Sequence, residues 1–258
     1  MLDTRMRSSR NPVLRYPIRV YQSDRASPTD TLTTDSPGKQ RGAVGVAPRR
    51  RLTLPLDKLH YISGEDVVVP EYRLTRMNDL IEGTPGHEEP LYRLPVGPIG
   101  PSTLMGTLLG LGRAALDFVI ENCASKAVTH TVYTRQSDSV AVQTQIAEAA
   151  LKIDTARLHS IAIVNKLDAA ANTSGTIDDA ARAWMRASSG YAVQQVLDAI
   201  QLLLSVHGSA AFAESSPLQR IWRDANVAGR HAGLNAAVGY EVLGKTLLAI
   251  PEQITPMV

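Results

Sequence analysis

Residues 138–172 read DSVAVQTQIAEAALKIDTARLHSIAIVNKLDAAAN, and this stretch decides the fold class. Its apolar residues recur at the i, i+3, i+4 and i+7 spacing that places them on one face of an α-helix. That face consists of Val142, Ile146, Ala149, Ile153, Ala156, Ile163 and Leu167. Asp138 or Ser139 is suited to cap the N-terminus, and the polar residues from Asn172 to Gly175 end the pattern. We predict one long helix.

Three further segments show the same period. The first runs from a Ser102 cap to about residue 128, and the second from Thr176 to Gly208. The last opens at Ser216–Pro217, a cap followed by a proline, and continues past a second cap at Asn235 to about residue 248. Long helices that each carry one apolar stripe must bury those stripes against each other. The sequence therefore predicts a mainly α fold, a long-helix four-helix bundle over residues 101–258.

The N-terminal part differs in composition. The 258-residue chain carries 27 Lys and Arg against 25 Asp and Glu, but residues 1–58 alone hold 12 basic and 5 acidic residues, a local charge of +7. This segment shows no sustained period, and we expect it to be disordered. Residues 59–100 contain a short β-branched run, Val67–Val69, and then a segment rich in Pro and Gly. We predict a remnant β segment and a linker there.

Several classes of function are not supported by the sequence. The single cysteine, Cys123, excludes an internal disulfide framework, and the six histidines show no metal-ligand spacing. Phosphate-binding loops and nucleophile elbows are missing, and Gly106, Gly110 and Gly112 are better explained by close helix packing. No apolar run approaches the length needed to span a bilayer. We expect a cytoplasmic protein with neither nucleic acid nor membrane as a partner.

Residues 216–234 read SPLQRIWRDANVAGRHAGL and resemble the C-terminal domain of the acyl-CoA dehydrogenase fold, in its reduced-flavin-dependent monooxygenase branch. Three other stretches agree in order and spacing: GEDVVVPEYRL at 64–74, TRQSDSVAVQTQIAEAAL at 134–151, and VHGSAAF at 206–212. The resemblance implies a flavoprotein oxidoreductase that uses reduced FMN or FAD and O₂ to oxygenate an aromatic or amino substrate. It also implies a separate flavin reductase and a homo-oligomer, either a dimer or a tetramer.

The resemblance assigns roles to four residues. His231 matches the family's catalytic histidine near the flavin ring, where it supports the oxygenated flavin or removes the proton of a phenolic substrate. An imidazole suits either task because it exchanges a proton near neutral pH. Arg135 matches an arginine that contacts the flavin, and a guanidinium offers a bidentate fork to phosphate. Gly208 and Ser209 match a turn that approaches the cofactor across a subunit interface.

The chain also departs from the family pattern. An N-terminal helical domain and most of a β-domain precede the matching segment in the family, and residues 1–58 do not resemble them. We therefore expect a truncated family member whose activity is impaired. Two alternatives remain open. One is an acyl-CoA dehydrogenase that uses FAD, although the glutamate base of that branch is not visible after Asp224. The other is a non-catalytic helical oligomerisation domain.

Overall fold

The computed structural model describes two strands and residues 77–255, apart from positions 85, 174 and 253. The chain divides into two compact units, Met1–Thr75 and Arg76–Val258, and each is described by itself. The prediction of a disordered basic segment over residues 1–58 lies outside the described residues, apart from one strand. The predicted domain boundaries therefore stay predictions.

The first unit contains a two-stranded antiparallel sheet of β1 (Leu14–Arg19) and β2 (Ser63–Val69). β2 confirms the strand expected at Val67–Val69. The register shifts between Tyr16 and Ile18, where the intervening Pro17 has no backbone N–H to donate to a ladder. The sequence pattern did not predict β1, although its apolar residues alternate with Arg and Pro.

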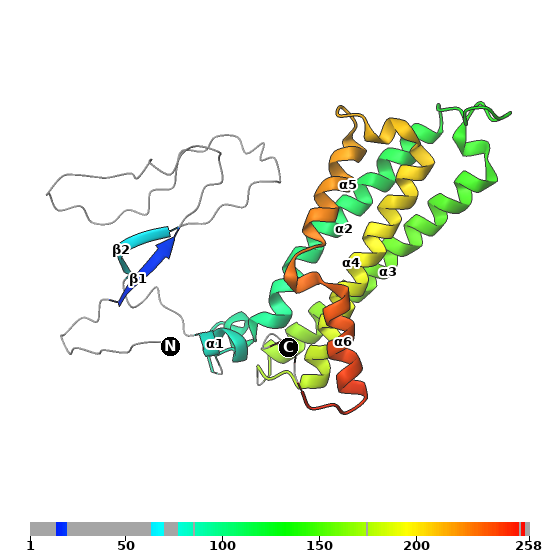
Figure 1. Cartoon of the computed structure of the whole chain (residues 1–258). Helices are drawn as coiled ribbons and strands as arrows, with labels where there is room; N and C mark the ends of the chain where they lie inside the picture. The colour runs from blue at the N-terminus through cyan, green and yellow to red at the C-terminus, as the bar shows by residue number, and fades with distance from the viewer. Residues whose placement is uncertain are drawn as a thin grey trace, which may run out of the picture. The chain divides into compact units, whose positions relative to one another are not determined.

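The second unit is helical, and its chain order is α1, η2, α2, η3, α3, α4, η4, α5, η5 and α6, where η denotes a 3-10 helix. The bounds are α1 Met77–Glu82, η2 Pro90–Arg93, α2 Val96–Cys123, η3 Gln136–Asp138, α3 Val140–Ala171, α4 Asp179–His207, η4 Ser209–Phe212, α5 Pro217–Ala228, η5 Ala232–Leu234 and α6 Ala236–Leu247. α2 and α4 run antiparallel to α3 and α5 (Figure 1). The mainly α bundle predicted from the helical period is confirmed.

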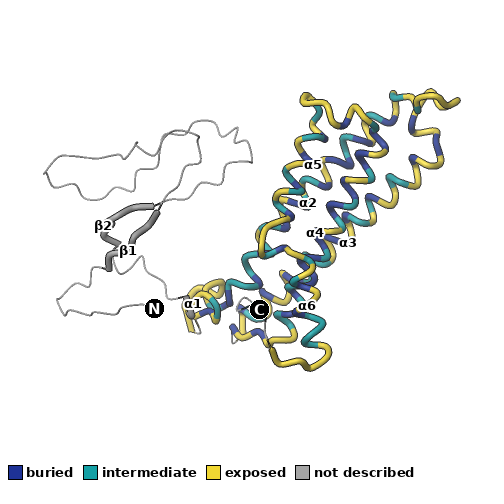
Figure 2. Tube along the Cα trace, in the orientation of Figure 1, coloured by how far each residue is buried: buried dark blue, intermediate teal, exposed yellow. Residues whose placement is uncertain are grey.

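The apolar faces predicted for the long helices form the core. α4 packs against α2, α3, α5 and α6, and the buried residues lie on the sides of these helices that face one another (Figure 2). Six of the seven residues predicted for the face of α3 are buried, and Ile146 is half-buried. α3 begins after Ser139, as predicted. α4 begins after Asp178, whose side chain accepts a hydrogen bond from the Ala181 N–H, two residues beyond the predicted Thr176.

The start of α2 corrects one prediction. The helix begins at Val96, after Pro95, and so includes part of the expected linker; it ends at Cys123, not near residue 128. Pro98 occupies the third helical position, where the N–H has no partner within the helix, so a proline is tolerated there. Ser102 is not an N-cap. Its hydroxyl donates to the Ile99 carbonyl oxygen at 2.7 Å, from within the helix.

The predicted fourth helix is two helices. α5 begins at Pro217 after Ser216, as expected, and ends at Ala228. α6 begins after Asn235, whose Oδ1 accepts hydrogen bonds from the N–H groups of Ala237 and Val238 at 3.1 and 3.4 Å. The cap predicted at Asn235 is therefore confirmed, but it starts a separate helix. The 229–235 segment between them is called the His231 turn below.

α6 lies unusually close to α4. A Cβ built on Gly190 of α4 would stand 2.6 Å from the Ala236 Cα, so only a hydrogen fits there. The prediction of close packing for the glycines of α2 is correct for Gly112, where a Cβ would lie 3.1 Å from Val196 Cγ1. It is wrong for Gly106 and Gly110, which are exposed and have no atom within 4 Å of such a Cβ.

Within the described residues, α2 is the helix long and apolar enough to cross a membrane by length and composition. The expectation that no apolar stretch is long enough was wrong, because polar and small residues interrupt the apolar run of α2 without lowering its mean hydropathy below that of a membrane-spanning helix. The buried face of α2, which includes Met105, Leu108 and Val119, packs within the helical core. Packing in the bundle buries about a third of the apolar window of this helix.

Candidate functional site

The structure places the predicted site residues near opposite ends of α4. Gly208 and Ser209 directly follow the C-terminus of α4, and Arg135 precedes η3 at the same end of the bundle. His231 lies in the turn that contacts Arg186, near the start of α4. Arg186 and His207 are 21 residues apart on α4, which corresponds to about 32 Å along a helix. Within one chain, His231 and the other three residues are therefore not neighbours.

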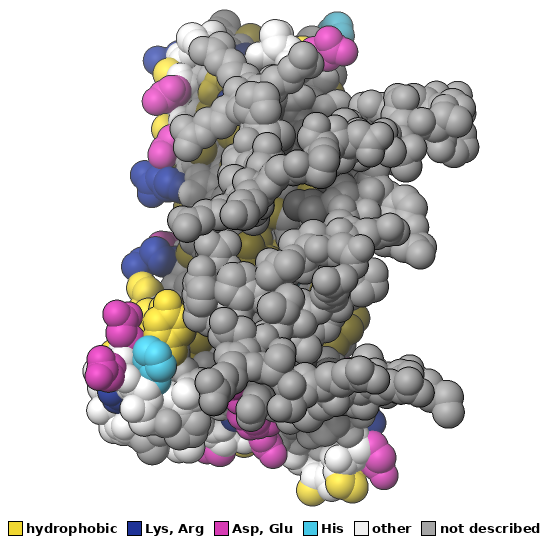
Figure 3. All heavy atoms as spheres, turned by 90° about the vertical axis from the view of Figure 1, so that its left-hand side faces the viewer, with side chains coloured by type: hydrophobic (Ala, Val, Ile, Leu, Met, Phe, Trp, Pro, Cys, Tyr) yellow, Lys and Arg dark blue, Asp and Glu magenta, His cyan; other side chains and the backbone are white. Residues whose placement is uncertain are grey.

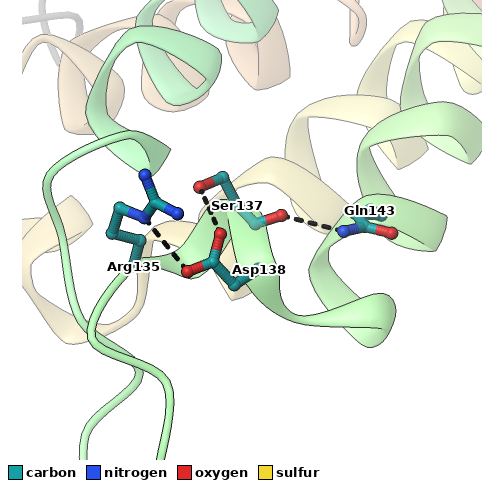
Figure 4. A network of polar contacts seen from close by, with 4 residues as sticks. All are labelled: Arg135, Ser137, Asp138 and Gln143. Atoms are coloured by element: carbon teal, nitrogen blue, oxygen red, sulfur yellow. Dashed lines mark hydrogen bonds and ion pairs between the residues drawn. The ribbon is translucent and has the colours of Figure 1, made fainter.

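Arg135 takes part in a small polar network at the surface (Figure 4). Its Nε lies 3.0 Å from Asp138 Oδ2, and the arginine side chain is 60% exposed. Ser137 Oγ donates to the other carboxylate oxygen at 3.4 Å, and Gln143 Nε2 donates to the Ser137 carbonyl oxygen at 2.8 Å. The carboxylate engages only the Nε side of the guanidinium.

The connection that carries Arg135 is attached to the last turn of α4 by two side chains. Gln136 is buried, and its Nε2 donates to the Val206 carbonyl oxygen at 2.7 Å. The Lys126 ammonium donates to the His207 carbonyl oxygen. Both acceptors belong to the carbonyl groups that a helix leaves unsatisfied at its C-terminus, where a cation is also favoured by the helix dipole. These bonds place Arg135 and Gly208 at one end of the bundle.

Gly208 is the C-cap of α4, as the sequence predicted. Its φ of 77° and ψ of −167° lie in a region that is essentially restricted to glycine. Its N–H donates to the Leu204 carbonyl oxygen at 2.9 Å, so this N–H is not available to a ligand. A Cβ at this position would have no atom within 4 Å, which leaves the turn open to close approach. Ser209 is exposed at the start of η4.

Two buried side chains at this end have shifted pKa values. Burial, with the Lys126 charge as a second cause, lowers the pKa of His207, whose Nδ1 is buried without a hydrogen-bond partner. The His207 ring packs against Phe118 with centroids 5.4 Å apart. Burial raises the pKa of the Cys123 thiol, which donates to Gln136 Oε1 at 3.6 Å. Cys123 is therefore a buried thiol without nucleophilic character.

An apolar groove of about 400 Å³ lies between the end of α2 and the start of α3. Its lining includes Ile120, Cys123, Val142, Ile146 and two residues of the Arg135 network, Ser137 and Gln143. A groove of this size, mostly apolar and with a few polar groups at one side, is typical of sites for flat organic ligands.

His231 is held in a defined orientation. It is the N-cap of η5, and its Nδ1 accepts a hydrogen bond from the Gly233 N–H at 3.1 Å. An imidazole nitrogen that accepts cannot carry the proton, so in the neutral ring the proton lies on Nε2. The residue is exposed, and Nε2 is the nitrogen left for a ligand. His231 therefore presents one proton donor of fixed tautomer.

Arg186, which lies on α4 beside this turn, was not predicted from the sequence. Its two terminal nitrogens donate to the carbonyl oxygens of Gly233 at 2.8 Å and Ala232 at 2.6 Å. One signal was available: Arg186 is a charged residue between Met185 and Ala187 in the apolar part of the predicted helix.

Among the residues that the structure describes, no group of three or more His, Cys, Asp or Glu side chains is arranged to hold a metal ion.

Three comparisons with known proteins agree. The chain is 29% identical over 221 residues to "FADH(2)-dependent resorcinol hydroxylase, oxygenase component" of Rhizobium sp. (strain MTP-10005), with 80% of this chain and 52% of the relative covered. It is 26% identical to "Flavin-dependent monooxygenase, oxygenase subunit HsaA" of Mycobacterium tuberculosis (strain ATCC 25618 / H37Rv), with 72% and 48% covered. The solved structure of XiaF from Streptomyces sp. in complex with FADH2 and glycerol matches with a TM-score of 0.69 at 33% identity, over 78% of this chain and 51% of that one.

The chain spans about half the length of these relatives. The family described as "Acyl-CoA dehydrogenase, C-terminal domain" matches residues 103–236, which is just over half of the chain and includes α3, α4, α5 and the His231 turn. The resemblance seen in the sequence is thereby confirmed: the chain belongs to the acyl-CoA dehydrogenase C-terminal domain family.

Proposed function

We propose that the chain acts as the C-terminal part of the oxygenase component of a reduced-flavin-dependent monooxygenase with an aromatic substrate. The support comes from relatives whose names describe such oxygenase components, together with the family match over the helical bundle. Bound reduced flavin would supply the electrons that reduce O₂, so that one oxygen atom enters the substrate and the other leaves as water. A separate reductase would deliver the reduced flavin.

The observation that carries the proposal is the hydrogen bonding of the His231 ring. Its Nδ1 is engaged by the Gly233 N–H, so Nε2 is the exposed position at which a proton is given or taken. Hydroxylation of a phenol requires a group that controls the proton of the phenol oxygen. An imidazole whose one nitrogen is engaged can give or take a proton at the other, which provides this control. We assign proton control to His231 Nε2.

The residues at the other end of α4 fit a phosphate-bearing aromatic cofactor. The Arg135 guanidinium keeps an exposed side that matches phosphate oxygens, and the apolar groove beside its network suits a flat ring. The open space at Gly208 allows a ligand to approach the backbone. We propose reduced FAD over reduced FMN because the resorcinol hydroxylase relative and the XiaF complex both carry FADH2 in their names. Because these residues lie far from His231, one flavin would use both sets only between two copies of the chain.

Exposed apolar side chains on α3 support association with a second copy. They include Val140, Leu151, Leu158, Ile161 and Val164. Apolar side chains also reach the surface between acidic and basic ones on the face seen in Figure 3. Apolar area of this kind is favourable to bury in an interface. We propose a cytoplasmic homo-oligomer, either a dimer or a tetramer, and light scattering of the purified chain tests its size.

Oxidation of reduced FAD by O₂ tests the function without knowledge of the substrate. Photoreduced FAD is mixed anaerobically with the chain, oxygen is added, and the rate of reoxidation is followed by absorbance. We expect the rate to depend saturably on chain concentration and to differ from that of free FAD. A rate equal to that of free FAD at every chain concentration would contradict the proposal.

Two variants locate the effect at His231. In His231→Asn, the amide oxygen can still accept from the Gly233 N–H, but the titratable Nε2 is lost. We expect this variant to retain reduced-FAD binding and to lose the change in reoxidation rate. His130→Asn is the matched control, because His130 is exposed in a loop with a φ of 59°, which asparagine also tolerates. It should behave as the unmodified chain does.

The exposed apolar side chains of α3 favour one second candidate, a non-catalytic helical oligomerisation domain. This candidate requires a uniform dimer or tetramer that binds neither reduced nor oxidised FAD. Saturable binding of reduced FAD would exclude it. An acyl-CoA dehydrogenase would instead require reduction of bound oxidised FAD by an acyl-CoA, which the same preparation tests directly.

A further inference from the structure

The Arg186 guanidinium bridges α4 and the His231 turn. Its terminal nitrogens donate to two consecutive carbonyl oxygens, those of Ala232 and Gly233, which directly follow His231. A planar fork with fixed donor directions restrains both peptide groups at once, which a single donor cannot do. Arg186 of α4 therefore restrains the backbone next to His231.

Two hydrogen bonds within the turn also involve His231. The Gly233 N–H donates to His231 Nδ1, and the Leu234 N–H donates to the His231 carbonyl oxygen at 2.8 Å. A Cβ on Gly233 would lie 3.1 Å from His231 Nδ1 and 3.2 Å from Pro101 Cγ of α2. The peptide whose N–H orients the imidazole thus belongs to the segment that Arg186 holds.

The Arg186 guanidinium is partly removed from water, which is unfavourable for a charged group. Its Nε is buried without a hydrogen-bond partner, and burial lowers the pKa of the guanidinium. Among the described residues, no carboxylate pairs with Arg186, and a half-buried cation of this kind contributes less to stability than a well-packed apolar side chain would. Its backbone position is also fixed, because a Cβ on Gly239 of α6 would lie 2.9 Å from the Arg186 carbonyl oxygen. This arrangement favours a role in orientation.

We propose that Arg186 is a positioning residue for His231: through the carbonyl groups of Ala232 and Gly233 it keeps the Gly233 N–H directed at Nδ1 and so keeps the imidazole proton on Nε2. The assignment of this proton to a reaction rests on the proposed function. The coupling between Arg186 and the tautomer of His231 does not, because it belongs to the chain without any ligand.

Nitrogen NMR of the full chain labelled with ¹⁵N-histidine measures the coupling directly. The two ring-nitrogen shifts distinguish the tautomers, and the His231→Asn spectrum identifies the His231 signals by their loss. We expect the neutral His231 ring of the unmodified chain to show the Nε2–H tautomer. In Arg186→Met, the shifts should move to those of a mixture of tautomers, while the other histidines keep their shifts. Arg186→Lys retains a donor and should restore part of the Nε2–H population.

Arg182→Met is the matched control. Arg182 lies one turn earlier on α4 and borders the same small cavity, but its Nε donates to the Ile177 carbonyl oxygen at 2.9 Å and its NH2 pairs with Glu82 at 3.6 Å. It should leave the His231 shifts unchanged. Unchanged His231 shifts in Arg186→Met would overturn the proposal, and so would an equal change in Arg182→Met, since that would show a general loosening of α4. If Arg186→Met does not fold, Arg186→Lys carries the same comparison.

A second readout links the coupling to the proposed function. We expect the effect of the chain on reduced-FAD reoxidation to fall roughly tenfold in Arg186→Met, since small displacements of a reacting group have effects of this size or larger. The affinity for reduced FAD should stay the same. A loss of flavin affinity without a change in the His231 shifts would contradict the positioning role. A changed tautomer in a chain that binds no flavin would support the coupling and reject the function.

Discussion

At the C-terminal end of α4, side chains from the α2–α3 connection donate to α4 itself: Gln136 to the Val206 carbonyl oxygen and Lys126 to that of His207. Near the N-terminal end the direction is reversed, and Arg186 of α4 donates to the carbonyl oxygens of the His231 turn. At its C-terminal end, α4 provides backbone carbonyl groups that accept hydrogen bonds. Near its N-terminal end, α4 provides the Arg186 side chain, which donates them.

The difference in hydrogen bonding between the two ends of α4 determines which side chain is held in one orientation. The bonds at the C-terminal end attach a connection to the helix, but Arg135 itself remains at the surface with a carboxylate from its own 3-10 helix. The bonds at the other end restrain the two peptide groups next to one imidazole. The first arrangement suits binding of an anionic group by an adaptable cation, and the second suits proton transfer at one defined nitrogen.

The largest expected effect concerns the contact of α4 with α6 that supports the His231 turn. Gly190→Ala places a Cβ 2.6 Å from the Ala236 Cα, and a backbone atom cannot move aside as the end of a flexible side chain can. We expect a loss of up to about 3 kcal/mol in the free energy of unfolding, measured by urea denaturation.

Gly110→Ala is the control, because Gly110 is exposed within α2 and no atom lies near the new Cβ. Alanine is the better helix former, so this variant should gain about 0.5–1 kcal/mol. Equal effects of the two substitutions would show that α6 does not lie against α4 as described.

The next largest effect on stability concerns the backbone at the C-terminal end of α4. Gly208→Ala introduces a side chain at a φ of 77° and a ψ of −167°, which costs about 1–3 kcal/mol although the space around it is open. The same urea denaturation measures it. If Gly208→Ala is as stable as the unmodified chain, the α4 C-terminus does not have the described turn.

A smaller effect is expected at the start of α6. Asn235→Ala removes an oxygen that accepts from two backbone N–H groups, and loss of an N-cap costs about 1 kcal/mol. Asn235→Asp retains the acceptor and should keep most of the stability. Equal losses in both variants would argue against a capping role.

The smallest effect is a pH dependence at the C-terminal end. Because the pKa of His207 is lowered in the fold, the unfolded chain takes up the proton at a higher pH than the folded chain does. Stability should therefore fall as the pH drops below about 6.5, the unfolded value, towards the lowered folded value. His207→Leu should flatten this slope in urea denaturation between pH 7 and pH 5. An unchanged slope would assign the dependence to other groups.

Local signals in the sequence were sufficient to predict the long helices and the positions of several helix ends. Gly208 acts through its own dihedral angles and Asn235 through hydrogen bonds to the next residues, so both ends could be predicted locally. α3 begins after Ser139 although the Ser139 side chain makes no capping hydrogen bond. The start of α2 was missed because prolines normally indicate a boundary; Pro98 lies in the first turn, where a proline is tolerated, but Pro101 lies inside the helix.

The orientation of the site could not be predicted from the same kind of signal. Arg186 bonds to carbonyl groups 46 and 47 residues further along the chain, and Gln136 bonds to one 70 residues away. Backbone carbonyl groups are the same in every residue, so the sequence contains no pattern that identifies these partners. His231 and Arg135 were found by resemblance, and their separation along α4 became visible only in the fold.

The most direct test of the account is a calorimetric titration of the full chain with reduced FAD under anaerobic conditions, in the unmodified chain and in two arginine variants. Arg135→Met removes the proposed anion contact, whereas Arg113→Met removes an exposed arginine that pairs with Asp117 on α2 in a similar way. The account predicts saturable binding that weakens roughly tenfold in Arg135→Met, the size of a lost charge-assisted hydrogen bond, and is unchanged in Arg113→Met. No binding of reduced FAD, or equal binding by both variants, would contradict it.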